Sequence, residues 1–248
     1  MIVTAYKTDK ITAGARLFHI LDQYLPKLAE EDIVVITSKI VSICQSRVVV
    51  NDGTTDKYAL IRREADAVIE DEKLKRLGVI LTIKDDILIP NAGIDESNGN
   101  GYFILWPKDI HKTTADIWQH LRKKHSLKHL GVIITDSHTT ALRWGTTGMG
   151  LAWAGFEALN NYIGAPDIFG RKLRVTKASI LDGLSAASVV SMGEGNEQTP
   201  LAVIGDVSFV TFQDRPPIKG EIAALRISLD EDIFSPLLTA APWKQKKK

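Results

Sequence analysis

The most constraining feature of the sequence is the stretch from Gly131 to Gly155, in which an apolar run ends in polar residues. Val132 to Ile134 predict a buried strand that stops at Asp136-Ser137, so a carboxylate and a hydroxyl are expected at the strand's end. Such oxygen ligands suit Mg²⁺ or Mn²⁺. An aspartate that caps an ordinary turn is the alternative explanation. Glycines follow that would let backbone N–H groups approach an anion closely: Gly145, Gly148, Gly150 and Gly155.

The composition excludes several classes of protein. The chain has 248 residues, enough for one large domain or two small ones, and its 44% hydrophobic and 25% charged residues are typical of globular proteins. The single cysteine, Cys44, excludes an intrachain disulfide and a cysteine-based zinc site. No apolar run is as long as a membrane span, and residues 1–10 lack the apolar stretch of a secretory signal. We therefore expect a cytoplasmic protein without a membrane partner.

The charge distribution argues against a nucleic-acid partner. The net charge is +1, and it includes four lysines near the C-terminus, Lys244, Lys246, Lys247 and Lys248. Without these lysines the net charge becomes −3, so the sequence predicts no basic surface for nucleic acid. We expect the lysine-rich end to be solvated rather than to act as a binding arm.

Hydrophobic periodicity predicts a mixture of strands and helices without internal repeats. Strands are predicted over residues 2–5, 32–36, 47–50, 79–83, 87–89, 102–106, 132–134, 172–175, 201–204 and 207–212. Helices are predicted over residues 17–25, 56–70, 114–124, 156–163 and 176–192, the last with Thr176 as its cap, whereas residues 222–229 fit either a strand or a helix.

Three acidic residues, Asp95, Asp136 and Glu194, each follow an apolar element and stand beside glycine or a hydroxyl. Carboxylates that converge on divalent cations are typical of phosphoryl-transfer enzymes. Local alternatives stay open, because Asx-rich residues 91–98 also fit a surface turn and Gly193 also fits a helix C-cap. No Walker-type phosphate loop, dinucleotide-binding glycine motif or convincing Ser-His-Asp order occurs in the sequence.

Five separated blocks resemble the coenzyme F420-0:L-glutamate ligase family. The blocks are SKIVS at 38–42, PNAGIDESN at 90–98, GVIITDS at 131–137, DIFGRKLRVT at 167–176 and MGEGNEQTP at 192–200, in the family's order. The resemblance implies an α+β, F420-ligase-like fold of two intimately packed mixed α/β domains and an intertwined homodimer with the active-site groove at its interface. It treats residues 1–248 as one unit, whose subdomain boundary is not readable from the sequence.

The resemblance also implies GTP-dependent γ-glutamyl ligation between L-glutamate and a carboxylate-bearing acceptor such as coenzyme F420-0. GTP would be the co-substrate, with two Mg²⁺ or Mn²⁺ ions and K⁺ as a further candidate ion. By motif, Asp95 and Asp136 would hold one metal, and Ser137 and Glu194 the other. No general base is assigned. The implied nucleotide contacts are Ser38, Lys39, Asn98, Met192, Gly193, Glu194, Gly195, Asn196, Glu197, Gln198 and Thr199.

Departures from the family pattern leave the substrate open. Ile43 replaces a nucleotide-binding lysine, which removes a charge-assisted contact of about 1.5–3 kcal/mol. Thr8-Asp9-Lys10-Ile11 replaces a segment that packs on the base, His138-Thr139-Thr140 replaces Asn/Phe-Gly-Arg, and Trp144 replaces an arginine. The hypotheses are therefore a ligase acting on F420-0 or a similar acceptor, a folate γ-glutamyl ligase, a non-catalytic nucleotide- and metal-binding module, and a phosphohydrolase.

Overall fold

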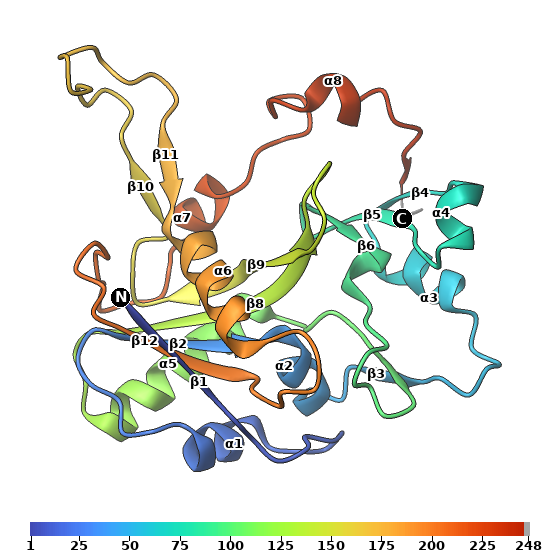
Figure 1. Ribbon diagram of the computed structural model, residues 1–248, viewed down its shortest axis with the longest axis horizontal. Coiled ribbons are helices and arrows are strands. Elements are labelled where there is room, and N and C mark those ends of the chain that lie inside the picture. Colours follow the sequence, from blue (N-terminus) through green and yellow to red (C-terminus); the bar gives the residue numbers. More distant parts are fainter. Residues whose placement is uncertain (246–248) are drawn as a thin grey trace. The chain divides into compact units, whose positions relative to one another are not determined.

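The computed structural model describes residues 1–245 as a mixed α/β chain with several sheets (Figure 1), which confirms the predicted class. Lys246, Lys247 and Lys248 lie outside the described residues, so the expectation of a solvated lysine-rich end stays a prediction. Unit 1 comprises Met1–Ile11, Arg16–Ile40 and Asp109–Leu225, and unit 2 comprises Thr12–Ala15, Val41–Lys108 and the residues from Arg226 onward. No helix within residues 1–245 is both long and apolar enough to cross a membrane.

Unit 1 is built on a five-stranded sheet. Its strands follow the order β1 (Ile2–Tyr6), β12 (Leu201–Gly205), β2 (Asp32–Thr37), β8 (Leu130–Thr139) and β9 (Thr146–Ala154). β2 and β8 are parallel, with Thr37 aligned to Thr135, and the other neighbours are antiparallel. Because parallel strands end at the same edge of a sheet, the residues after Thr37 and Thr135 are brought together.

Helices cover both faces of this sheet. In Figure 1, α6 (Ile180–Met192) lies in front of the sheet and α5 (Ile110–His125) behind it. Leu181 and Leu184 of α6 pack in one apolar core with residues of β2, β8, β9 and β12. The remaining elements of this unit are α1 (Leu17–Tyr24), β10 (Leu159–Asn161), β11 (Lys177–Ser179) and α7 (Lys219–Ala224). The short helix α2 (Ser38–Cys44) follows β2 directly.

Unit 2 contains two smaller antiparallel sheets. One has the order β13 (Lys244–Gln245), β4 (Ala67–Ile69), β5 (Leu81–Lys84) and β6 (Ile87–Pro90), and the other pairs β3 (Val48–Val50) with β7 (Tyr102–Ile104). Its helices are α3 (Lys57–Glu64), α4 (Glu72–Arg76), the 3₁₀ turn η1 (Asn91–Gly93) and α8 (Ser235–Leu238). Leu60, Ile61, Ile80 and Phe103 are among the buried residues of its core.

Several predicted element boundaries are wrong. The helix predicted over 56–70 ends at Glu64, because Ala65 turns to extended backbone and residues 67–69 pair with β5. The helix predicted over 156–163 is replaced by β10, and the strand predicted over 172–175 lies instead at β11. Residues 207–212 contain only an isolated bridge at Phe212. Ser179, not Thr176, caps α6, since its side chain accepts a hydrogen bond from the Asp182 N–H.

The strand that carries Asp136 is longer than expected. β8 does not stop at Asp136-Ser137 but continues to Thr139, because β9 returns as its antiparallel partner and pairs with residues 135–139. A register shift between Ile134 and Thr135 marks the point where the hairpin leaves the central part of the sheet. Asp136 and Ser137 therefore lie within a paired strand rather than in a loop.

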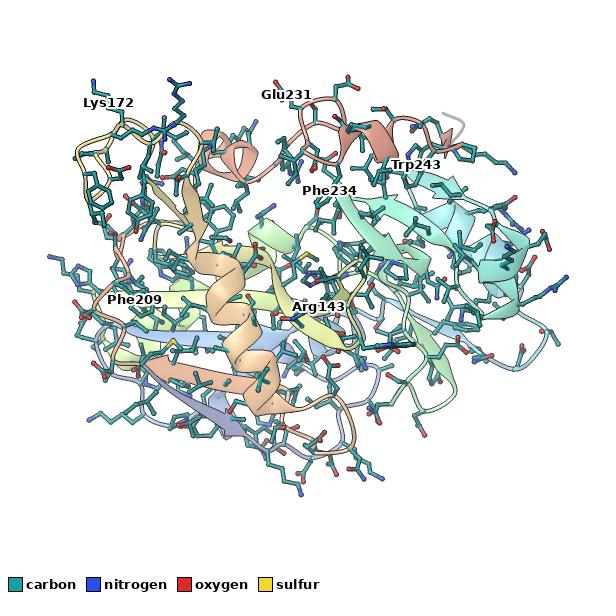
Figure 2. The ribbon with its side chains drawn as sticks, turned by 45° about the horizontal axis from the view of Figure 1, so that its top comes forward. Arg143, Lys172, Phe209, Glu231, Phe234 and Trp243 are labelled. Carbon is teal, nitrogen blue, oxygen red and sulfur yellow. The ribbon has the colours of Figure 1, made fainter. Side chains whose placement is uncertain are left out.

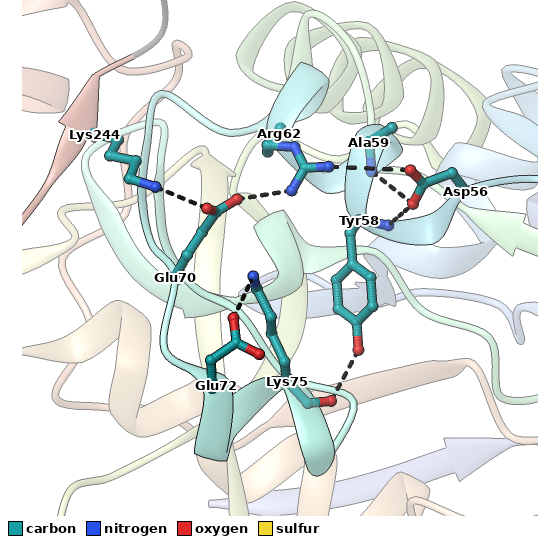
Figure 3. A network of polar contacts seen from close by, with 8 residues as sticks. All are labelled: Asp56, Tyr58, Ala59, Arg62, Glu70, Glu72, Lys75 and Lys244. Atoms are coloured by element: carbon teal, nitrogen blue, oxygen red, sulfur yellow. Dashed lines mark hydrogen bonds and ion pairs between the residues drawn. The ribbon is translucent and has the colours of Figure 1, made fainter.

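Within unit 2, an ion-pair network links β13 to the residues around β4 (Figure 3). Glu70 accepts hydrogen bonds from Lys244 Nζ at 2.8 Å and from Arg62 at 2.7 Å. Led by the hydrogen bond from Lys244, these contacts lower the pKa of Glu70 from 4.5 to about 2. A carboxyl group with a depressed folded-state pKa stabilises the fold above its unfolded pKa, and this contribution is lost as the pH falls toward the folded value.

We therefore expect β13 to detach from β4 as the pH falls from 4.5 to about 2. Hydrogen exchange of the β13 and β4 amides, corrected for intrinsic rates, measures this. Glu70→Gln should raise exchange of these amides already at neutral pH. Glu72→Gln is the matched control, because Glu72 pairs with Lys75 and does not contact β13 in Figure 3. Protection that is unchanged by acid and by Glu70→Gln would contradict the assignment.

Candidate functional site

A serine and an aspartate meet at the ends of the two parallel strands. Ser38, the first residue of α2, donates a hydrogen bond from Oγ to Asp136 Oδ2 at 2.7 Å. The Ser137 N–H donates to Asp136 Oδ1 at 2.8 Å, so both carboxylate oxygens are oriented. Ser38 is buried and Asp136 half-buried. Both of these donors are neutral and orient the carboxylate, as outer hydrogen bonds to a cation ligand do.

Asp136 and Ser137 face opposite sides of the sheet, because successive side chains of a strand alternate. Ser137 pairs with Gly148, and a Cβ at Gly148 would lie 2.3 Å from the carbonyl oxygen of Ser185 in α6. Ser137 is therefore on the face that carries α6, and Asp136 points to the other face, toward Ser38. One metal ion cannot bind both side chains directly.

Glu194 lies on the same side as Ser137. It follows Gly193, the C-cap of α6, and its Oε1 accepts a hydrogen bond from Thr146 Oγ1 at 3.2 Å. Thr146 pairs with Thr139, which is two residues after Ser137 and so shares its face of β8. The sequence did not predict the contact between Thr146 and Glu194. It depends on the pairing of β8 with β9, which places Thr146 near the end of α6.

The loop after α6 is held by hydrogen bonds within itself and by hydrogen bonds to Thr8. The Gly195 N–H donates to Glu197 Oε2 at 2.8 Å, and Thr199 Oγ1 donates to the Met192 carbonyl. The Thr8 N–H donates to the Gln198 carbonyl at 2.9 Å, and Gln198 Nε2 donates to the Thr8 carbonyl at 3.3 Å. No local sequence signal indicated the Thr8 contact, because it joins segments 190 residues apart.

The residues expected to contact the nucleotide differ in their exposure to solvent. Residues 193–198 are exposed, and Lys39 and Thr199 are half-buried. Met192 is buried in the core of unit 1, so its side chain packs against protein and its carbonyl serves the loop. Ile43, which belongs to unit 2, is also buried.

Asp95 belongs to unit 2, where its backbone pairs with Ile104 through N–H···O contacts of 3.0 and 2.8 Å. Its two carboxylate oxygens accept from the Ser97 N–H at 2.7 Å and from Ser97 Oγ at 3.1 Å. The Asx turn is therefore present, and Asn98 follows it with a left-handed φ of 54°. Asp95 and Asp136 belong to different units, and their shared metal stays a prediction. Within residues 1–245, no three His, Cys, Asp or Glu side chains form a group that could hold a metal.

Packing accounts for three of the four glycines that follow Asp136. A Cβ at Gly148 or Gly150 would lie 2.3 Å from atoms of α6, and one at Gly155 would lie 2.0 Å from the Leu130 carbonyl oxygen. Only Gly145, with nothing within 4 Å, lies in open space. It belongs to the β8–β9 turn, beside the exposed Arg143 (Figure 2) and Trp144. Close packing, not approach to an anion, therefore requires the glycines of β9 and Gly155.

Comparisons with known proteins match the site-bearing part of the chain. The family described as F420-0:Gamma-glutamyl ligase matches residues 6–206. The coenzyme F420:L-glutamate ligase of Methanococcus maripaludis strain C7 is 31% identical over 220 residues, covering 84% of this chain and 86% of the relative. The corresponding ligase of Methanosarcina barkeri is 33% identical over 190 residues, covering 72% of this chain and 74% of the relative. The family match begins at the end of β1, ends just beyond β12 and covers more than half of the chain. Because of this match and the similarity to the two ligases, this chain belongs to the F420-0:γ-glutamyl ligase family, a family of ligases.

Proposed function

We propose that this protein is a GTP- and metal-dependent ligase that forms a γ-glutamyl amide between L-glutamate and a carboxylate-bearing cofactor, coenzyme F420-0 or a similar acceptor. Membership of a ligase family supports the reaction class. The observation that carries the proposal is the oriented Asp136 carboxylate beside Ser38, at the carboxyl ends of two parallel strands. Ligands of open α/β sheets commonly bind at this edge.

In the proposed reaction, an acceptor carboxylate oxygen attacks the γ-phosphorus of GTP, and GDP leaves. The glutamate amine then attacks the acyl carbon of the acyl phosphate, the C–O bond to phosphate breaks, and the amine loses a proton to solvent. Bound Mg²⁺ or Mn²⁺ would neutralise phosphate charge during the transfer. Asp136 with Asp95, and Ser137 with Glu194, would hold the ions; these all-oxygen donors fit either metal.

The protein's own groups have separate tasks in this proposal. Ser38 holds the Asp136 carboxylate in one orientation, and Lys39 supplies a positive charge at the start of α2. The loop over residues 193–199 offers backbone and side-chain polar groups to the nucleotide, and its hydrogen bonds to Thr8 fix its path. We further propose a homodimer, with K⁺ as an additional candidate ion and the cytoplasm as the site of action.

A second candidate is a nucleotide- and metal-binding module without ligase activity. Buried Ile43 favours it, because an apolar side chain in place of lysine removes a phosphate contact. If the protein is a ligase, a folate is an alternative acceptor, because the residues around Trp144 differ from the family pattern.

Phosphate release distinguishes these functions. The protein is incubated with Mn²⁺, L-glutamate and either GTP or ATP, with F420-0 or a folate monoglutamate supplied in turn, and products are weighed by mass spectrometry. We expect one acceptor to gain a glutamyl mass, with one phosphate released per bond formed. Nucleotide binding without phosphate release on any pair would support the binding module. Phosphate release without a gain in acceptor mass would indicate a phosphohydrolase.

A further inference from the structure

Residues 159–179 of unit 1, from β10 to β11, form an extended segment that we call the arm. The arm has regular backbone hydrogen bonds, but its large apolar side chains at residues 168 and 169 are exposed. Its backbone is regularly bonded: the Gly164 N–H donates to the Leu173 carbonyl at 2.8 Å, and the Leu173 N–H to the Ala165 carbonyl at 2.9 Å. Even so, Ile168 and Phe169 are 92% and 88% exposed. A folded segment that leaves large apolar side chains in water is a candidate for contact with a partner.

The arm is also strongly basic. It contains Arg171, Lys172, Arg174 and Lys177 against one acidic residue, Asp167, and so has a net charge of +3. None of the four basic side chains forms an ion pair with another residue of the described chain, 1–245, and Lys172 projects outward from the arm in Figure 2. Asp167 is used internally, since its Oδ1 accepts from the Phe169 and Arg171 N–H groups at 2.9 Å.

Unit 2 carries a segment of opposite charge, the acidic segment, defined as residues 227–238. It contains Asp230, Glu231 and Asp232 and no basic residue, for a net charge of −3. Its apolar side chains are exposed as well, with Ile233 at 86% and Leu237 at 72%. Figure 2 shows Glu231 and Phe234 on this segment. Among residues 1–245, no cation pairs with these three acidic side chains.

The acidic segment is folded, because the Glu231 N–H donates to the Ser228 carbonyl at 3.1 Å and the Phe234 N–H to Asp232 Oδ1 at 2.8 Å. It lies beyond residues 6–206, the part of the chain that the family match covers.

We propose that the arm of one copy of this chain docks on the acidic segment of a second copy. The two surfaces carry equal and opposite charge, and each has exposed apolar side chains beside its charged ones. A second copy supplies both surfaces, so a two-fold dimer would make the contact twice. The inference rests on the homodimer of the proposed function and names its surfaces. It does not depend on the ligation chemistry.

Charge reversal tests the docking through the molar mass in solution, measured by light scattering after size-exclusion chromatography. The arm variant carries Lys172→Glu and Arg174→Glu, and the segment variant carries Asp230→Lys and Glu231→Lys. Either variant alone places like charges at both contacts, so we expect the dimer dissociation constant to rise at least about tenfold. The matched control is Lys123→Glu with Lys128→Glu, two exposed lysines on α5 and just after it, and it should leave the dimer unchanged.

Mixing the two variants provides the decisive result. In a mixed dimer, the reversed arm meets the reversed segment and the native arm meets the native segment, so an equimolar mixture should recover the dimer with one copy of each. A monomeric wild-type chain, a dimer that neither variant weakens, or a mixture that stays monomeric would overturn the proposal. The assay contains no nucleotide or acceptor, so such a failure leaves the ligase proposal to its own test. Circular dichroism confirms that the variants are folded.

Discussion

Asp136→Asn is expected to reduce glutamyl transfer at least about a hundredfold, because it removes the negative charge that would hold a metal ion. The substitution keeps the shape of the side chain. Its amide oxygen can still accept from the Ser137 N–H, and the Ser38 hydroxyl can rotate to accept from the new amide group. The fold should therefore survive while turnover is lost, as measured by phosphate release and by the mass of the acceptor.

Asp116→Asn is the control for this loss. Asp116 is an exposed carboxylate on α5 that pairs with Lys112 at 2.6 Å, so its neutralisation should leave turnover unchanged. Thermal unfolding of both variants separates a chemical defect from a folding defect. Wild-type turnover by a folded Asp136→Asn variant would remove Asp136 from the proposed site.

Gly148→Ala is expected to lower the free energy of unfolding by about 2–3 kcal/mol. The new Cβ would lie 2.3 Å from the Ser185 carbonyl oxygen and 2.6 Å from its carbonyl carbon, so the backbone of α6 must move away from β9. Rotation of a side chain cannot relieve a clash with backbone. The shift would also disturb the end of α6, where Glu194 contacts Thr146. Urea unfolding measures the loss.

Gly183→Ala is the matched control, because Gly183 lies within α6 with nothing within 4 Å of its Cβ position. Alanine favours helix over glycine by about 0.8–1.0 kcal/mol, so this variant should be as stable as the wild type or more so. Equal stability of the Gly148→Ala variant and the wild type would show that α6 does not pack against β9 as closely as described.

The long apolar runs were predictable from sequence. β2 and β12 are buried through most of their length, and continuous apolar runs such as Ile33 to Ile36 give an unambiguous signal. The helix around Ile117 and Leu121 was predictable for a similar reason, because its buried residues recur at helical spacing. A strand or helix that buries one continuous surface can therefore be predicted from its own stretch of sequence.

Short elements and polar contacts were not predictable in the same way. β10 and β11 have three residues each, which is too short for a hydrophobic periodicity to be recognised. They are strands because they pair with each other. Ser38 and Asp136 were both expected in the site, but their hydrogen bond joins residues 98 positions apart and depends on the parallel pairing of β2 and β8. The Thr146–Glu194 contact likewise depends on the length of the hairpin.

The order of strands in the main sheet has a consequence for biosynthesis. β12 lies between β1 and β2, so neither of the first two strands can complete its pairing until residue 205 has left the ribosome. Until then, the nascent chain exposes one edge of β2, whose Ile33 to Ile36 are fully buried in the finished protein. Unpaired apolar strand edges promote aggregation, so chains released before β12 is made should depend on chaperones to stay dispersed.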